Sequence, residues 1–304
     1  MTSNEQGNSK SPIDLLRIVL RGPAQVMFQD SPVTGLLFLT GIAVASPLTA
    51  VGALIGAIIG PLVAALARFD RDDIEQGIHG FNPVLVGIAA LFYLEPEPLT
   101  WILLVVGCVA STFVTHWMRK HLHFPTYTSP FIVVTWVVIL VAHAVAGTAI
   151  DVKPAAIEHT PVGFLDEVFR GAAEVMFGAN IVTGLLFVVG IAVCNWRHAV
   201  LAFLGSFLGL LVAIYHGDPS TAISLGIYGY NASLAAIAVF LWRESLLIPI
   251  LAALISVPLT EFFPGTLGIP ALTAPFVAAS WVVLTLGVLE KVFLRQEPAS
   301  KAGT

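Results

Sequence analysis

Charged residues are scarce in this chain. Asp, Glu, Lys and Arg together make up 11% of its 304 residues, whereas 57% are hydrophobic. The net charge of −5 is modest and no large basic cluster occurs, which argues against a nucleic-acid partner. The apolar residues form long blocks rather than the short alternation typical of a soluble core. We therefore predict an all-α integral membrane protein.

Motifs that carry catalytic or redox chemistry are also missing. The two cysteines, Cys108 and Cys194, lie inside apolar blocks, and we interpret them as small core residues rather than as part of a disulfide or metal framework. No nucleotide-binding loop, catalytic triad or zinc motif occurs, so we predict no enzyme, no cofactor and no metal site. His79 and His143 lack ligand-type neighbours, and we interpret both as structural histidines with satisfied hydrogen bonds.

The hydrophobic blocks number ten. A helix that crosses a membrane needs about 20 apolar residues, so we expect some of the shorter blocks to be broken or re-entrant. The polar start "MTSNEQGNSKSP" does not resemble a cleavable signal, and the next stretch, "IDLLRIVLRG", has the amphipathic spacing of a helix on the membrane surface. The ten blocks run through residues 33–46, 48–67, 80–94, 99–117, 130–149, 181–195, 199–215, 222–241, 245–260 and 275–294.

The chain repeats itself at an offset of 149 residues. Residues 21–44 and 170–193 share sixteen of 24 positions, and the same offset carries "GIHGFNPVLVGIA" (77–89) onto "GIYGYNASLAAIA" (226–238). This is an internal duplication. Each half holds five hydrophobic elements, and because five is odd, the second half must enter the membrane from the opposite side. Inverted repeats of this kind predict a pore at the repeat interface.

The distribution of Lys and Arg predicts the orientation. When ten crossings are laid on the chain from the inside, twelve of the fourteen Lys and Arg residues fall on the cytoplasmic side. This bias predicts a multi-pass protein of the cell inner membrane with both termini in the cytoplasm. The predicted regions are a cytoplasmic N-terminal segment with an amphipathic helix (1–20), a first repeat (21–150), an extracytoplasmic linker (151–169), a second repeat (170–295) and a cytoplasmic tail (296–304).

Each repeated motif stands where a predicted helix begins. A third pair, "PTYTSPF" (125–131) and "PALTAPF" (270–276), is found at an offset of 145. Glycine, asparagine and proline suit the ends of helices. We therefore predict that the following residues begin or cap their helices: Gly80, Gly229, Asn82, Asn231, Pro130 and Pro275.

The other matched residues of the motifs are candidates for a solute path. An ionisable residue within a membrane is a functional candidate by default, which makes Glu174 the strongest of them. The alternative is that Glu174 is an interfacial carboxylate paired with Arg170 one turn earlier. The aromatic residues would equally suit core packing. Each half supplies an oxygen-bearing side chain (Gln25 and Glu174), a threonine (Thr128 and Thr273) and an aromatic (Phe81 and Tyr230).

These motifs, in the same order in both halves, resemble those of the urea transporters. The shared pattern is an "x-VMF" element led by Gln or Glu, then "G-[FY]-N-x-x-L" and "P-x-x-T-x-P-F", and the likeness covers about residues 14–295. The resemblance implies a homotrimer in which each subunit holds its own pore, narrowed to a slot with aromatic walls and acceptor oxygens along its edges. By motif position, the pore residues would be Gln25, Phe28, Phe81, Leu85, Thr128, Glu174, Val175, Tyr230, Leu234 and Thr273.

A slot of this kind suits urea, which is small, planar and neutral and carries four N–H donors. Acceptor oxygens in series would replace the water stripped from those donors, and apolar walls would exclude ions. We therefore expect channel-type, downhill passage of urea and similar small amides. The alternative is ion-coupled secondary transport with Glu174 as the titrating group. One departure is Tyr230, because the family usually has phenylalanine there and the added hydroxyl needs a partner.

Overall fold

The computed structural model describes residues 11–146, 163–263 and 268–294, and within these ranges it contains helices and no strands. The prediction of an all-α membrane protein is confirmed. The predicted tail (296–304), residues 1–10 of the N-terminal segment and residues 151–162 of the linker lie outside the described residues.

Ten helices correspond to the ten predicted hydrophobic blocks. Among the described residues, four helices, α3, α6, α10 and α14, are long and apolar enough to cross a membrane, whereas the other six are shorter. The short helix α2 has 14 residues, and at about 1.5 Å per residue it is shorter than the hydrocarbon layer. The ten helices are α2 (Pro32–Ala45), α3 (Pro47–Leu66), α5 (Phe81–Tyr93), α6 (Pro98–His121), α7 (Ser129–Ala146), α9 (Ile181–Cys194), α10 (Trp196–His216), α12 (Gly229–Trp242), α13 (Leu247–Glu261) and α14 (Ala274–Phe293).

Each repeat opens with a further helix, α1 (Pro12–Gln25) or α8 (Phe164–Glu174), and two short helices, α4 (Arg71–Glu75) and α11 (Ser220–Leu225), occupy equivalent places. Helix α1 starts with a capping box between Ser11 and Asp14, which satisfies two free N–H groups. Its first turns expose Leu15 and Leu16, whereas Ala24 near its end is fully buried. The helix therefore runs from the surface into the interior and ends at Gln25.

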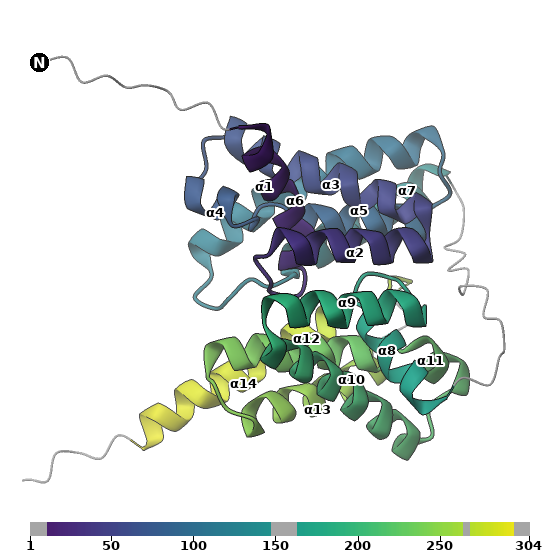
Figure 1. The fold of residues 1–304 in the computed structure, drawn as a ribbon, viewed down its shortest axis with the longest axis vertical. Coiled ribbons are helices and arrows are strands. Elements are labelled where there is room, and N and C mark those ends of the chain that lie inside the picture. The colour runs from purple at the N-terminus through teal and green to yellow at the C-terminus, as the bar shows by residue number, and fades with distance from the viewer. Residues whose placement is uncertain (1–10, 147–162, 264–267, 295–304) are drawn as a thin grey trace, which may run out of the picture.

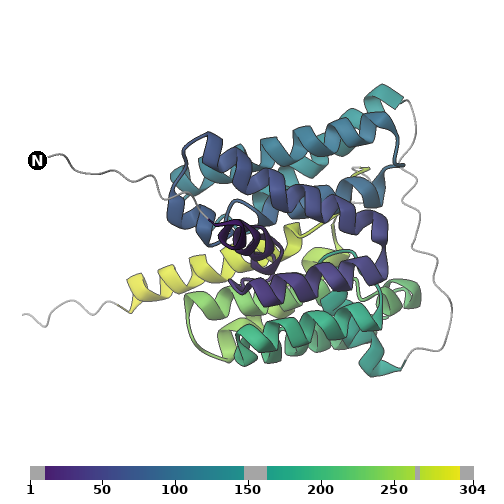
Figure 2. The same ribbon diagram turned by 45° about the horizontal axis from the view of Figure 1, so that its top comes forward.

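Reciprocal contacts between α2 and α9 define a two-fold relation between the repeats. Thr34 Oγ1 donates to the Gly190 carbonyl at 2.7 Å, and Thr183 Oγ1 donates to the Gly41 carbonyl at 2.8 Å. The start of each helix thus meets the end of the other, so the two helices are antiparallel. Figures 1 and 2 show the helices of the first repeat on one side and those of the second on the other, with α2 and α9 packed together between them. The repeats are therefore inverted.

Small residues allow close helix packing within each repeat. A Cβ at Gly56 would lie 2.2 Å from the Pro83 carbonyl oxygen, and one at Gly205 would lie 2.5 Å from the Ala232 carbonyl oxygen. These contacts bring α3 against α5 and α10 against α12, the two most extensive helix pairs of the fold. Close backbone approach through glycine is the usual way in which helices associate in a membrane. The duplication has kept this packing in both halves.

The structure corrects the predicted role of Asn82 and Asn231. Neither caps its own helix: each lies inside the first turn of α5 or α12. Instead, Asn82 Oδ1 accepts from the Phe131 N–H at 3.2 Å at the start of α7, and Asn231 Oδ1 accepts from the Phe276 N–H at 3.1 Å at the start of α14. The free N–H groups of a helix start are therefore satisfied from a neighbouring helix, which fixes the threonine-bearing segment against the aromatic motif.

Candidate pore

Thr128 and Thr273 meet at the centre of the molecule. Their Oγ1 atoms lie 2.6 Å apart, and both side chains are buried. The segments that carry them are held by a second reciprocal pair of bonds, because Trp136 Nε1 donates to the Pro270 carbonyl at 2.8 Å and Trp281 Nε1 donates to the Pro125 carbonyl at 2.9 Å. The two predicted threonines, which are 145 residues apart in sequence, thus form one contact between the repeats.

A cavity of about 490 Å³ lies on one side of this contact. Three predicted residues, Gln25, Phe28 and Phe81, line it together with Tyr127 and, from the second repeat, Trp242. Gln25 Nε2 donates to the Gln76 carbonyl at 2.8 Å. This bond orients the carboxamide and leaves its Oε1 as an acceptor.

The equivalent region of the second repeat carries Glu174. Glu174 is the last residue of α8, is half-buried, and lies within electrostatic range of Tyr93 and Tyr230. Phe177 lies three residues after Glu174, and its ring contacts Phe92 and Tyr93 with centroid distances of 4.8 Å and 5.7 Å. The mouth at Glu174 therefore includes aromatic rings from α5, just as the mouth at Gln25 includes Trp242 from α12.

The hydroxyl of Tyr230 has a partner within the protein. It donates to the Leu272 carbonyl at 2.6 Å. The corresponding first-repeat pair is Phe81 and Tyr127, and Phe81 has no hydroxyl with which to make this bond. The substitution that sets Tyr230 apart from the usual phenylalanine therefore occupies a backbone acceptor next to Thr273.

Four residues at equivalent places have left-handed backbone conformations. Phe28 and Phe177 have φ of 62° and 60°, and Tyr127 and Leu272 have φ of 47° and 49°. Such values are uncommon for residues other than glycine and cost free energy. Two lie three residues after the ends of α1 and α8, and two lie immediately before the threonines, so four of the five described non-glycine residues with this backbone are at the candidate pore; the fifth, Arg68, lies elsewhere.

Phe177, rather than Val175, is the structural equivalent of Phe28. Val175 is buried in the hydrophobic core, as are the predicted wall residues Leu85 and Leu234. Sequence reasoning missed Phe177 although the offset of 149 that aligns the repeats carries residue 28 onto residue 177. It also missed Tyr93 and Trp242 at the far ends of α5 and α12. The only sequence signal for these two residues is that the offset of 149 makes them equivalent.

His79 differs from its prediction. It is 1% exposed, yet neither ring nitrogen has a hydrogen-bond partner in the described part of the chain. Burial disfavours the imidazolium and lowers the pKa of His79 to about 4, despite the opposing attraction of Asp73. His79 is therefore a buried neutral histidine, but its hydrogen bonds are not satisfied by the protein.

Among the described residues, one group of side chains has metal-ligand chemistry: His216, Asp218 and Glu261, whose ligand atoms lie within 4.8 Å of one another. The group lies at the ends of α10 and α13. His216 Nδ1 is already 2.9 Å from Glu261 Oε1, so an ordinary hydrogen bond accounts for this contact.

Comparison with known proteins decides the family. A urea transporter family model matches residues 16–288. The chain belongs to the urea transporter family. It is 25% identical over 292 residues to urea transporter 1 of Ovis aries, with 88% of this chain and 76% of the relative covered. It is 26% identical over 301 residues to urea transporter 1 of Mus musculus, with the same coverage. The first repeat, all but the last residues of the second repeat, and every candidate pore residue fall within the matched range.

Proposed function

We propose that this chain conducts urea down its concentration gradient through a pore at the interface of its two repeats. Family membership establishes urea as the transported solute. The observation that supports the path is the contact between Thr128 and Thr273, because it joins the two repeats midway between the mouths that contain Gln25 and Glu174. A solute that follows the two-fold interface must pass this contact.

The residues along this path fit the chemistry of urea. From one mouth to the other, the proposed acceptors are the Gln25 carboxamide oxygen, the hydroxyl oxygens of Thr128 and Thr273, and the Glu174 carboxylate. Together with the rings of Phe28, Phe81, Phe177 and Tyr230, they would form a polar edge beside apolar walls. The acceptors would offset the desolvation of the N–H donors, and neutral acceptors at the centre would keep binding weak enough for release.

The cellular setting is also part of the proposal. We propose that the protein lies in the inner membrane with its termini in the cytoplasm, which places Gln25 at the cytoplasmic mouth and Glu174 outside. The distribution of Lys and Arg in the sequence supports this orientation. We further propose a homotrimer of independent pores, which rests on family likeness, and leucine, isoleucine and valine side chains exposed on most helices provide apolar surface for lipid or neighbouring subunits.

Stopped-flow light scattering on proteoliposomes tests the function. We expect rapid uptake of urea, slower uptake of larger amides, and no accumulation of urea above its external concentration. The same vesicles should be measured with an imposed proton gradient and with an imposed sodium gradient. Accumulation of urea against its own gradient in either case would overturn the channel and support ion-coupled transport with Glu174 as the titrating group.

A further inference from the structure

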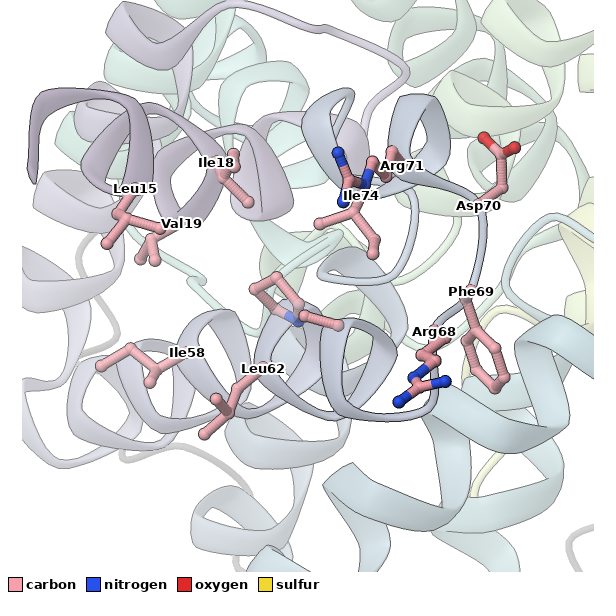
Figure 3. A pocket seen from close by; sticks show the side chains of 12 residues that line it. Leu15, Ile18, Val19, Ile58, Leu62, Arg68, Phe69, Asp70, Arg71 and Ile74 are labelled. Atoms are coloured by element: carbon pink, nitrogen blue, oxygen red, sulfur yellow. The ribbon is translucent and has the colours of Figure 1, made fainter. Parts of the chain in front are cut away.

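A large cavity lies outside the candidate pore, in a groove between α1, α3 and α4. Its volume is about 1040 Å³, the upper end of the range for small-molecule sites. We call it the α1/α3 groove and define it by Leu15, Ile58, Leu62, Arg68, Arg71 and Ile74, which are among its lining residues. Figure 3 shows apolar side chains from α1 and α3 facing each other across it, with the two arginines at one end.

The apolar part of the groove is open at the surface of the helix bundle. The side chains of Leu15, Ile58 and Leu62 are 54%, 51% and 53% exposed. Ile58 and Leu62 belong to α3, which is one of the helices long enough to cross the membrane. This part of the groove therefore faces the hydrocarbon of the bilayer, where an acyl chain is the available occupant.

The arginines at the end of the groove have no partner among the described side chains. Arg68 and Arg71 are exposed and make no hydrogen bond or ion pair there. Other arginines that we place at the same membrane face are engaged: Arg17 pairs with Asp14, Arg119 with Asp73 and Arg243 with Glu290. Two guanidinium groups at the membrane interface thus remain available for an external anion.

Asp70 lies between these arginines in sequence but does not neutralise them. Its Oδ1 accepts from the N–H groups of Asp72 and Asp73 at 3.0 Å and 3.1 Å, so the carboxylate caps α4. Figure 3 shows this carboxylate directed away from the apolar side chains of the groove. Arg68 itself has a φ of 57°, a conformation in which glycine costs less, so a charged side chain is held here despite the backbone strain.

We propose that the α1/α3 groove binds an anionic glycerophospholipid, with its phosphate between Arg68 and Arg71 and an acyl chain along Leu15, Ile58 and Leu62. A phosphate accepts charge-assisted hydrogen bonds from guanidinium groups, and its natural depth in a bilayer is the interface where these arginines lie. A free phosphate would leave the apolar groove unfilled. A second protein copy would need an acidic group opposite both arginines. This proposal does not depend on the position of the urea pore.

Native mass spectrometry of the purified protein tests the site. The probes are phosphatidylglycerol and phosphatidylcholine with identical acyl chains, titrated separately. Because each basic residue near the surface favours anionic lipid, we expect the protein to bind phosphatidylglycerol on the order of tenfold more tightly. The double variant Arg68→Gln/Arg71→Gln should lose this preference. The matched control Arg197→Gln/Arg243→Gln removes the same charge from arginines that already have carboxylate partners, and it should keep the preference.

A third variant tests the apolar half of the groove. Ala65 lines the cavity, and Ala65→Trp would fill it without removing either arginine, so binding of both lipids should weaken. Urea flux should stay unchanged in all three variants, which confirms that they fold. Retention of the lipid preference in the Arg68/Arg71 variant, or unchanged binding in Ala65→Trp, would overturn the proposal. A change in subunit number with unchanged lipid binding would also overturn it, because the groove would then be an interface between copies.

Discussion

The two mouths of the candidate pore are related by the duplication but differ in chemistry. One mouth has the neutral carboxamide of Gln25, which is fixed by a bond to the Gln76 carbonyl. The other has the carboxyl group of Glu174, within electrostatic range of Tyr93 and Tyr230. The surrounding backbone is almost the same, since Phe28 and Phe177 have φ values within a few degrees of each other. The two mouths therefore differ in their side chains although the backbone around them is alike.

The centre of the candidate pore is more nearly symmetrical than its ends. The threonine pair, the tryptophan bonds and the asparagine bonds all occur in both repeats with similar lengths. Passive transport requires a path that works in both directions, and a symmetrical centre supplies this. The mouths meet different compartments, so they are free to diverge. The predictions below test whether this difference between centre and mouths governs transport.

The largest effect is expected at the mouth that contains Glu174. Glu174→Val removes both acceptor oxygens, so we expect urea flux to fall about 50-fold. Gln25→Val removes one free acceptor and should lower flux about tenfold. Flux per folded protein is measured by stopped-flow uptake into proteoliposomes. Glu174→Gln is the matched control, and it should keep flux within about threefold because it retains an acceptor. Equal losses in the two valine variants would show that Glu174 has no greater role than Gln25.

The next effect concerns the central threonines. Thr128→Val and Thr273→Val each leave the partner hydroxyl without its hydrogen bond, and we expect similar losses of about tenfold in urea flux. Because the two hydroxyls act as a pair, the fold-loss of urea flux in the double variant should be smaller than the product of the two single fold-losses. Thr183→Val, which disturbs a reciprocal bond of the frame, is the control and should affect thermal stability more than flux. Clearly unequal single losses would contradict the symmetrical centre.

The sequence predicted the helices well because long apolar blocks need the bilayer whatever their partners are. The offset of 145 also identified Thr128 and Thr273 as equivalent residues, and the structure adds that they contact each other. The roles of individual side chains could not be predicted, because they depend on the direction in which each side chain faces once the helices pack. Val175 and Leu85 lie one turn or less from pore residues and yet face the core. Asparagine is a residue type that often caps a helix, which is why Asn82 was predicted to cap its own helix. Its side chain instead binds the N–H of Phe131, 49 residues away, so only the tertiary fold reveals its role.

A smaller effect is expected from the bond between Tyr230 and the Leu272 carbonyl. Tyr230→Phe would free this carbonyl and make the second repeat resemble the first, and we expect urea flux to change by about threefold or less, upward if the freed oxygen accepts from urea. Phe81→Tyr is the reciprocal variant and should lower flux if its hydroxyl occupies the Tyr127 carbonyl. Proteoliposome uptake of urea and thiourea would measure both. Changes of the same sign in the two variants would contradict this assignment.

The smallest effect on transport is expected at His79, whose equivalent in the second repeat is Tyr228. Neither ring nitrogen of His79 has a hydrogen-bond partner among the described residues, whereas the Tyr228 hydroxyl is not among the buried groups that lack one. Because the folded-state pKa of His79 is about 4 and the unfolded value is about 6.5, the unfolded chain binds more protons between these values. Stability should therefore fall as the pH drops from 7 to 5, by roughly 2 kcal/mol. Glutamine at position 79 cannot titrate, so the apparent melting temperature of His79→Gln should depend less on pH over this range, and urea flux should stay unchanged. An equally steep pH dependence of the melting temperature in the variant would show that a group other than His79 is responsible.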